Sequence, residues 1–155
     1  AHEDTTGPEI WEQSGHTVTA FCDFAGSGGT PGGVARFFAD KNVRSYVIEP
    51  RGAEAIADGD TSCPAHPVQG GGYMMHDLPH LRTVPISGAI TVSGADAKRY
   101  AGLLARYEGI FGGYSAGANL AGAVELLRQK EIGGSVAFVV CDSGLKYLST
   151  DLWRQ

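Results

Sequence analysis

The feature that most constrains the fold of this chain is an apolar segment that runs directly into a glycine-rich loop. Residues 18–25 (VTAFCDFA) are almost continuously apolar and rich in β-forming side chains, which is typical of a strand covered on both faces. The loop, residues 26–30 (GSGGT), is followed by Val34, Phe37 and Phe38 at helical spacing. The segment therefore predicts a buried strand, a tight loop and a helix, in that order.

A second β-rich run, residues 44–49 (RSYVIE), follows this helix and is stopped by Pro50. Strand, helix and strand in this order predict a right-handed crossover between parallel strands. A short helix is expected before the first strand, starting at Thr6 as a capping residue and ending near Gly15. These elements indicate the beginning of an α/β layer.

The second half of the chain is expected to add strands at residues 90–92 and 136–140, with helices after Ser93 and Ser115. The inner faces of these helices are predicted to carry Ala97, Tyr100, Ala101, Leu104 and Tyr107 in the first, and Leu120, Val124 and Leu127 in the second. The alternation of strands and helices predicts one α/β domain over residues 1–155, with three layers (αβα) and a mostly parallel sheet.

Residues 51–89 are rich in Gly, Pro and His and have weak periodicity, which indicates a long excursion with a helical turn near residues 53–57. Its histidines, His66, His76 and His80, lack the carboxylate–histidine spacing of a metal site. We therefore expect them to be surface or loop-packing residues, and we expect no metal site.

Composition and charge exclude several classes of protein. Of the 155 residues, 43% are hydrophobic and 19% are charged, which favours a folded chain. A net charge of −5 without a basic cluster argues against nucleic-acid and acidic-membrane partners. No apolar run approaches the ~18–20 residues that span a bilayer. The cysteines, Cys22, Cys63 and Cys141, show no CxxC spacing, so we expect no disulfide framework and a reducing, cytoplasmic setting.

The glycine-rich loop favours an anion-binding site. Glycines between a strand and a helix let successive backbone N–H groups point at one anion, and the helix N-terminus adds a favourable dipole. Ser27 and Thr30 offer hydroxyl donors, and the loop contains no Lys or Arg. This composition suits a phosphate held by neutral donors. A tight turn that binds no ligand is the alternative.

A dinucleotide is a second ligand that the loop could bind. Gly26 and Gly28 match the GxGxxG fingerprint, although Pro31 occupies the place of its third glycine. Glu49 ends the next strand, about 20 residues further on, where an acid that binds a ribose would lie. Sequence spacing alone leaves this alternative open.

Two further motifs resemble sites of nucleophilic catalysis, but the rest of the sequence lacks the residues that such catalysis needs. Residues 113–117 (GYSAG) fit the GxSxG pattern of hydrolases, but that motif follows a strand and needs a later histidine. No histidine follows His80, so a hydrolase is not predicted. Cys141 beside Asp142 has no paired base in the sequence, so we interpret it as a turn residue rather than a nucleophile.

Several separated segments, in order and over nearly the whole chain, together resemble one branch of the fold-type-II enzymes that use pyridoxal 5'-phosphate (PLP). That branch contains cysteine synthase (O-acetylserine sulfhydrylase) and cystathionine β-synthase. The matching segments are residues 5–11 (TTGPEIW), 26–30 (GSGGT), 48–50 (IEP), 66–70 (HPVQG), 108–110 (EGI), 115–118 (SAGA) and 142–151 (DSGLKYLSTD). The ordered set is far more specific than the glycine loop alone.

The resemblance implies a site for each end of the cofactor. In the family the glycine-rich loop holds the phosphate, which carries over to Gly26, Ser27, Gly28, Gly29 and Thr30. A serine in the late turn hydrogen-bonds the pyridine nitrogen and matches Ser143; a neutral partner of this kind favours α,β-elimination over transamination. On the substrate side, the family's active-site loop and cofactor wall match Gln69, Gly70, Gly113 and Tyr114.

The resemblance also implies a missing part. The family's Schiff-base lysine lies in an N-terminal Ser-x-Lys-like segment, and a second N-terminal loop binds the substrate carboxylate; neither has a match in these residues. We therefore interpret the chain as the C-terminal, cofactor-binding half of a cysteine synthase-like enzyme, completed by an N-terminal half or a complementary chain and acting on an amino-acid substrate. A homodimer is expected from the family. The alternatives are a non-catalytic remnant that binds a partner or a phosphorylated ligand, and a dinucleotide-binding module.

Overall fold

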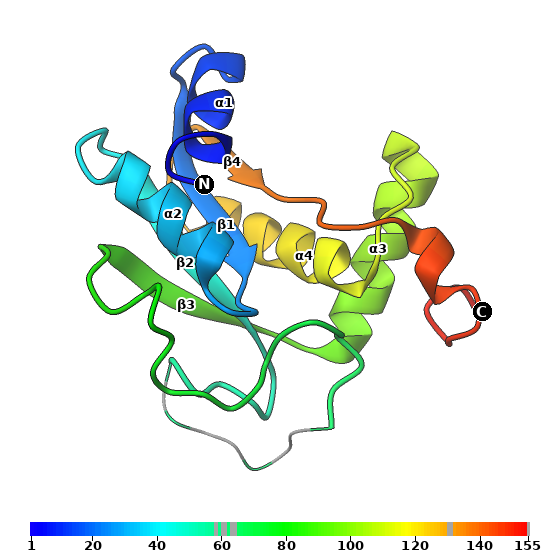
Figure 1. The fold of residues 1–155 in the computed structure, drawn as a ribbon. Coiled ribbons are helices and arrows are strands. Elements are labelled where there is room, and N and C mark those ends of the chain that lie inside the picture. Colours follow the sequence, from blue (N-terminus) through cyan, green and yellow to red (C-terminus); the bar gives the residue numbers. More distant parts are fainter. Residues whose placement is uncertain (58, 60–61, 63–64, 130–131, 155) are drawn as a thin grey trace.

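The fold is an all-parallel sheet between two layers of helices (Figure 1). The computed structural model describes every residue except 58, 60–61, 63–64, 130–131 and 155. The helices are α1 (Thr6–Gln13), α2 (Gly29–Phe38), α3 (Gly94–Glu108) and α4 (Tyr114–Arg128), and the strands are β1 (Val18–Phe24), β2 (Arg44–Pro50), β3 (Ile86–Val92) and β4 (Ser135–Phe138). A short 3-10 helix, η1 (Gly144–Tyr147), follows β4.

The strands are ordered β3-β2-β1-β4, so the first strand in the sequence lies in the interior of the sheet. Cys22 on β1 pairs with Tyr46 on β2 and with Phe138 on β4, and both pairings are parallel. A strand with neighbours on both sides and helices on both faces is shielded from water, which explains the continuous apolar run. The α/β class and the parallel sheet expected from the sequence are confirmed.

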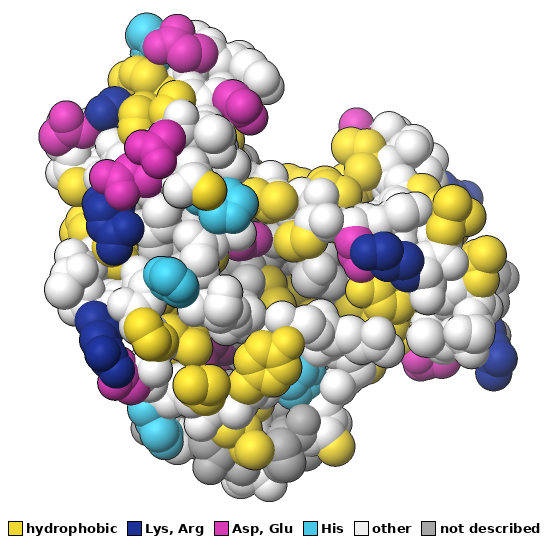
Figure 2. Space-filling view, in the orientation of Figure 1, with side chains coloured by type: hydrophobic (Ala, Val, Ile, Leu, Met, Phe, Trp, Pro, Cys, Tyr) yellow, Lys and Arg dark blue, Asp and Glu magenta, His cyan; other side chains and the backbone are white. Residues whose placement is uncertain are grey.

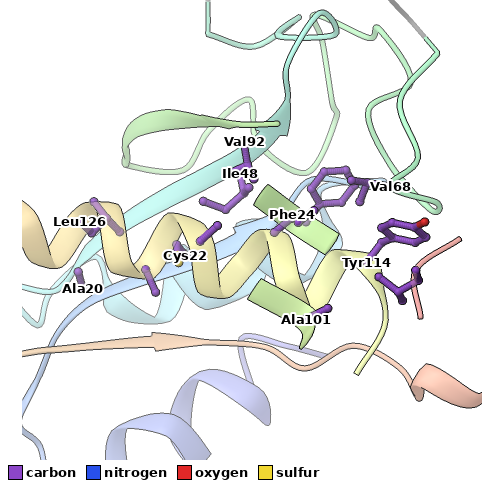
Figure 3. Packing of buried hydrophobic residues seen from close by; sticks show 14 of the residues in the cluster. Ala20, Cys22, Phe24, Ile48, Val68, Val92, Ala101, Tyr114 and Leu126 are labelled. Carbon is purple, nitrogen blue, oxygen red and sulfur yellow. The ribbon is translucent and has the colours of Figure 1, made fainter. Parts of the chain in front are cut away.

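An apolar cluster lies on each face of the sheet, between the strands and the helices that cover them. Phe21 on β1 packs with Val34 and Phe38 of α2, and α1 covers this cluster from outside. On the opposite face, the larger cluster contains Cys22 of β1 and Leu126 of α4 (Figure 3). Alternate residues of one strand thus face different layers, as the pleat of a strand requires.

Helices α3 and α4 approach each other closely at Gly117. A Cβ atom there would lie 2.0 Å from the Ala97 carbonyl oxygen and 2.7 Å from the Ala101 backbone nitrogen. We expect Gly117→Ala to lower the free energy of unfolding by about 1–3 kcal/mol, because the two helix backbones must move apart to admit the methyl group. Urea denaturation followed by circular dichroism measures the change.

Gly102 on α3 provides the matched control for Gly117. Among the residues that the structure describes, none has an atom within 4 Å of a Cβ placed at Gly102, so Gly102→Ala is expected to raise the free energy of unfolding by about 0.5–1 kcal/mol. If both alanine variants were equally stable, the close approach of α3 and α4 at Gly117 would be wrong.

Small residues at the contact between α3 and α4 change which side chains of the two helices are buried. Some of the large apolar side chains lie at the surface as a result. Tyr107 and Leu127 were expected to face inward but are 68% and 50% exposed. Helix α4 buries Ala118, Ala121 and Leu126 instead. The prediction from large apolar side chains was wrong here because alanine and glycine allow the closer contact.

Three local expectations also need correction. Thr6 lies inside α1, whose N-cap is Thr5, and neither the Thr5 hydroxyl nor any other side chain caps the helix. Within residues 53–57 only residues 55–57 form a turn, and none is helical; β3 begins at Ile86, earlier than the expected residues 90–92. The Ser93 cap is confirmed, because its hydroxyl accepts a hydrogen bond from the Asp96 amide at 3.0 Å.

The surface shows no dominant charge on the face drawn in Figure 2, where acidic and basic side chains are interspersed. In the same view a lobe made of α3 and the C-terminal segment projects from the main body, and the surface is concave between them. Within the described part of the chain, no helix is both long and apolar enough to cross a membrane.

Candidate cofactor site

A pocket of about 350 Å³ opens at the carboxyl ends of β1 and β4. Its walls come from four separate segments: the end of β1, the long β2–β3 connection, the start of α4, and the turn after β4. The lining residues are Phe24, Gln69, Gly70, Ser115, Cys141, Asp142, Lys146 and Tyr147. The carboxyl edge of a parallel sheet is where open α/β folds bind ligands. The pocket is therefore the candidate functional site.

The glycine-rich loop connects β1 to α2 beside this pocket. Gly28 adopts φ of 81°, a left-handed conformation that favours glycine, and precedes the first residue of α2. The N-cap residue Gly28 has no side chain to cap the helix, which leaves the N-terminus of α2 open to an anion. The Ser27 hydroxyl accepts a long hydrogen bond, 3.4 Å, from the Gly29 amide. The strand–loop–helix unit predicted from the sequence is therefore present.

The β2–β3 connection places a second glycine-rich segment directly on this loop. A Cβ atom on Gly26 would lie 2.6 Å from the Gly70 carbonyl oxygen, and one on Gly71 would lie 2.4 Å from the Ala25 carbonyl oxygen. The Gly72 amide also donates to the Ala25 carbonyl oxygen at 3.3 Å. The structure therefore brings Gln69 and Gly70 together with the glycine loop, and only glycine fits where the two backbones touch.

The turn after β4 presents Ser143 at the rim of the site. The Ser143 backbone forms an antiparallel bridge to Gly112, and the Gly144 amide donates to the Phe111 carbonyl oxygen at 2.8 Å. The Ser143 oxygen accepts a hydrogen bond from the Leu145 amide at 3.3 Å. Since it accepts here, its own O–H remains available as a donor. Ser143 is exposed and adjoins Asp142, which lines the pocket.

Asp142 ties η1 to the pocket wall. Its carboxylate accepts a hydrogen bond from the Tyr147 hydroxyl at 2.7 Å and lies 3.9 Å from the Lys146 ammonium group. Burial, together with the Asp142 charge, raises the pKa of Tyr147 well above its ordinary range. A Cβ atom on Gly113 would lie 2.4 Å from Asp142 Oδ1 and 2.3 Å from the Tyr147 ring, so Gly113 makes room for this contact.

Tyr114 points into the protein core rather than into the pocket. It is 1% exposed, packs edge-on against Tyr147 with 5.6 Å between ring centroids, and donates its hydroxyl hydrogen to Asp151. Burial is the main cause that raises the pKa of Tyr114 to about 12. Gly113 and Tyr114 thus support the wall from behind, while Ser115 is the neighbour that lines the pocket.

A buried polar cluster lies behind the pocket, between β1 and β4. The Asn119 amide of α4 donates to Asp23 Oδ1 at 2.8 Å and to the Val139 carbonyl oxygen at 2.9 Å. Asp23 is 3% exposed, and burial raises its pKa to about 7 despite the Asn119 hydrogen bond. The only sign of this buried acid in the sequence is that Asp23 is the one acidic residue in the apolar run of residues 18–25.

Cys141 belongs to the same cluster although part of the residue is exposed. Its sulfur lies 3.8 Å from the Asn119 amide nitrogen and 4.0 Å from Asp23 Oδ1. Burial, followed by the Asp23 charge, raises the pKa of the Cys141 thiol to about 11. At neutral pH the sulfur is therefore a thiol rather than a nucleophilic thiolate, consistent with the interpretation of Cys141 as a turn residue.

Glu49 is engaged in holding the β2–β3 connection. Its carboxylate accepts hydrogen bonds from the Ile56 amide at 2.9 Å and the Ala57 amide at 2.8 Å, and the residue is buried. A ribose-binding acid must offer its carboxylate to the ligand. The structure thus explains Glu49 without a dinucleotide.

The histidines of the same connection pack against its backbone. His66 Nε2 lies 3.3 Å from the Gly72 carbonyl oxygen, and His76 Nδ1 lies 3.0 Å from the Ala55 carbonyl oxygen. Among the described residues, no group of three metal-ligating side chains is placed to hold an ion. Cys63, between these histidines and Glu49 in the sequence, falls outside the described residues.

Comparison with known proteins identifies relatives in both sequence and structure. Residues 1–142 match the family model described as pyridoxal-phosphate dependent enzyme. Cysteine synthase of Buchnera aphidicola is 33% identical over 164 residues, which cover 99% of this chain and 51% of that protein. Cysteine synthase 3 of Caenorhabditis elegans is 34% identical over 156 residues, covering 99% and 45%, respectively.

Solved structures share the fold. Cysteine synthase of Entamoeba histolytica superimposes with a TM-score of 0.88 at 28% identity, covering 99% of this chain and 45% of that one. The O-acetylserine dependent cystathionine β-synthase of Helicobacter pylori gives a TM-score of 0.86 at 31% identity, covering 98% and 49%. The chain thus spans about half the length of the relatives it matches.

These comparisons confirm the resemblance drawn from the separated sequence segments, and the fold matches that of the fold-type-II relatives. The cofactor of the matched family is pyridoxal phosphate. The family model covers residues 1–142, which include the glycine loop and the start of the late turn and end just before Ser143. This chain therefore belongs to the pyridoxal-phosphate dependent enzyme family.

Proposed function

We propose that this chain is the cofactor-holding part of a PLP enzyme that replaces the β-substituent of an activated serine, as cysteine synthase does with O-acetylserine and sulfide. The observation that supports this most is the meeting of distant segments at one pocket. Gly70 lies against the glycine loop, and Asp142, next to Ser143, lines the same space. This arrangement supports a site in which the glycine loop and Ser143 hold opposite ends of one cofactor.

The residues present fit PLP in shape and in donor chemistry. The contact of Gly26 with the Gly70 carbonyl oxygen leaves no room for a side chain, so the two loops form a fixed cradle of backbone groups. The uncapped start of α2 favours a phosphate there. The Ser143 hydroxyl can donate to a pyridine nitrogen, and the pocket volume of about 350 Å³ suits a small-molecule ligand.

Bound pyridoxal phosphate supplies an electron sink that weakens bonds at the α-carbon of an amino acid. In this chain, the loop from Gly26 to Thr30 holds the phosphate, and Ser143 hydrogen-bonds the ring nitrogen without protonating it. Gln69, Gly70 and Ser115 line the space beside them, where the polar groups of the substrate amino acid are accommodated. These roles position the reacting groups and require a lysine from elsewhere to move the proton.

The remaining partners follow from the same proposal. The lysine and the carboxylate-binding loop come from a complementary half, since the chain spans only about half of its relatives. Assembly as a homodimer is part of the proposal. The cytoplasmic setting expected from the cysteines remains a prediction.

We expect the chain to bind PLP much more tightly than pyridoxal, because the cradle recognises the phosphate. A loss of even one charge-assisted hydrogen bond costs about 1.5–3 kcal/mol, so the preference is expected to exceed tenfold. Titration followed by cofactor absorbance and by calorimetry measures both affinities. Inorganic phosphate is expected to compete with PLP.

A complementation assay tests the enzymatic part. The chain alone is expected to form no cysteine from O-acetylserine and sulfide. Mixing it with the half of a cysteine synthase that it does not match is expected to restore turnover. Phosphate-dependent PLP binding that never gains activity would identify a non-catalytic remnant. Binding of NAD without binding of PLP would replace the proposal by a dinucleotide module.

A further inference from the structure

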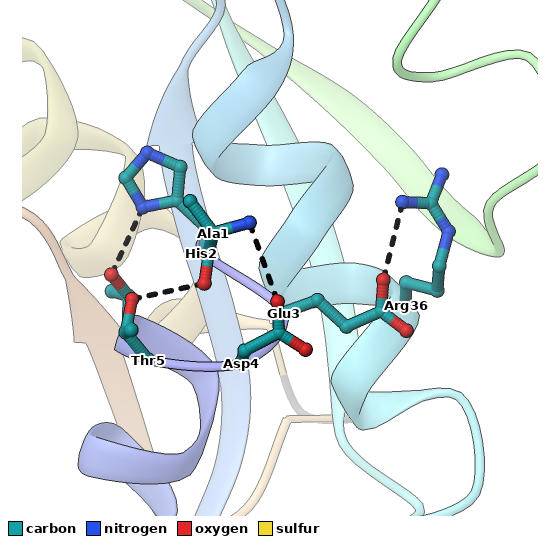
Figure 4. Close-up of polar contacts among 7 residues, drawn as sticks. Ala1, His2, Glu3, Asp4, Thr5 and Arg36 are labelled. Atoms are coloured by element: carbon teal, nitrogen blue, oxygen red, sulfur yellow. Dashed lines mark hydrogen bonds and ion pairs between the residues drawn. The ribbon is translucent and has the colours of Figure 1, made fainter.

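His2 connects the segment before α1 to the glycine-rich loop through two threonines. Its Nδ1 atom lies 2.9 Å from Thr6 Oγ1, and its Nε2 atom lies 3.3 Å from Thr30 Oγ1. Figure 4 shows the His2 ring and the polar contacts of the surrounding segment. Thr30 is the last residue of the loop and lies in the first turn of α2. The imidazole therefore reaches one of the hydroxyl groups assigned to the phosphate.

Backbone packing fixes the position of this imidazole. A Cβ atom on Gly33 would lie 2.8 Å from His2 Cβ and 3.0 Å from the Glu3 backbone nitrogen, so the segment lies directly on α2. The Gly7 amide donates to the His2 carbonyl oxygen at 2.9 Å. The Glu3 carboxylate lies 3.5 Å from the Arg36 guanidinium group of α2 (Figure 4). His2 thus approaches Thr30 from a segment anchored at several points.

The hydrogen-bonding capacity of a neutral imidazole links the two contacts. One ring nitrogen donates and the other accepts. When the Thr6 hydroxyl donates to Nδ1, Nε2–H donates to the Thr30 oxygen. The Thr30 hydroxyl hydrogen is then free to point away from His2, toward an anion at the start of α2. Reversing the tautomer would use that hydrogen for His2 instead.

We propose that His2 is a positioning residue that orients the Thr30 hydroxyl as a donor to the phosphate, while the Thr6 hydroxyl holds the other ring nitrogen. This inference rests on the proposed function, because it deepens the role of the same loop. It assigns to the segment before α1 a part in cofactor affinity, in addition to packing. His2 does not itself touch the ligand in this scheme.

Three substitutions at His2 separate positioning from packing. His2→Ala removes both contacts and is expected to weaken PLP binding about tenfold, which corresponds to the loss of one oriented hydrogen bond. His2→Gln keeps an N–H group near the Nε2 position and is expected to stay within about twofold of the parent. His2→Asn keeps only the contact near Nδ1 and is expected to resemble His2→Ala. Calorimetry measures each affinity.

Two controls make the test specific. Pyridoxal lacks the phosphate, so its affinity is expected to be the same for the parent and the three His2 variants. His16→Ala removes an exposed histidine that contacts Glu12 and Trp11, and it is expected to leave PLP binding unchanged. Thermal denaturation without ligand reports any loss of folding in each variant.

A double-mutant cycle with Thr30 decides the inference. In the Thr30→Val background, His2→Ala is expected to cause no further loss of PLP affinity, because the hydroxyl that His2 orients is gone. Additive losses, or equal losses for PLP and pyridoxal, would overturn the positioning role while leaving the proposed function intact. If the parent chain bound neither PLP nor inorganic phosphate, the proposed function and this inference would both fail.

Discussion

Replacing Asp23 by asparagine is expected to raise the free energy of unfolding at pH 8 by about 4 kcal/mol, because each unit of pKa shift corresponds to about 1.4 kcal/mol. Burial raises the pKa of Asp23 from 3.8 to about 7 in the folded chain. The folded state therefore holds a proton that the unfolded state releases between these values. Stability from this group is fully present below pH 3.8 and is lost as the pH rises to about 7.

Urea denaturation at intervals from pH 4 to pH 8 tests the prediction. The parent is expected to lose stability over this range relative to Asp23→Asn, whose side chain keeps an oxygen to accept the Asn119 hydrogen bond and carries no charge. Asp77→Asn is the control, because Asp77 forms an exposed ion pair with Arg82, and exposed pairs contribute little to stability. Parallel pH profiles for the parent and Asp23→Asn would show that Asp23 is ionised and accommodated in the fold.

Gly26→Ala is expected to weaken PLP binding about 100-fold. The new methyl group would lie 2.6 Å from the Gly70 carbonyl oxygen, and backbone must move on one loop or the other. Overpacking of this kind costs about 1–3 kcal/mol, and 2.7 kcal/mol is about 100-fold in affinity. The cost falls on binding because the displaced backbone is the cradle itself. Calorimetric titration with PLP measures it.

A second variant on the opposing loop shows whether the contact or the glycine itself matters. Gly71→Ala places its methyl group 2.4 Å from the Ala25 carbonyl oxygen and is expected to weaken PLP binding to a similar degree. Gly133→Ala serves as the control, because no atom of the described residues lies within 4 Å of a Cβ placed there. Circular dichroism verifies that each variant is folded. Normal PLP affinity in Gly26→Ala would contradict the assignment of the loop as the phosphate cradle.

Local patterns in the sequence were sufficient to predict the unit that carries the proposed phosphate cradle. The apolar run ending at Phe24, the glycines after it and the spacing of Val34 and Phe38 are short-range signals, and β1, the loop and α2 follow them closely. The approach of Gly70 to Gly26 has no such signal, because the β2–β3 connection lacks periodicity. Family resemblance alone led to that expectation.

Other features depend on strand order, which no local pattern carries. Asp23 and Asn119 meet because β4 returns to pair with β1, and α4 crosses behind both. Tyr114 shows the same limitation on a smaller scale. Helix α4 begins at Tyr114 rather than after Ser115, and packing against Tyr147 turns the ring into the core. The sequence was sufficient to recognise the segment that contains Tyr114, but tertiary contacts set the direction of the Tyr114 side chain.

The pocket walls come from segments far apart in the sequence. Phe24 is the last residue of β1, and Tyr147 is the last residue of η1. The cradle is a local structure that can form early in folding, whereas the complete cavity requires the last strand to dock beside the first. A partly folded chain would thus possess the glycine turn without a usable pocket. A ligand that contacts every wall binds only the completely folded chain. Its binding therefore stabilises the docking of the last strand beside the first, and its affinity reports whether folding is complete.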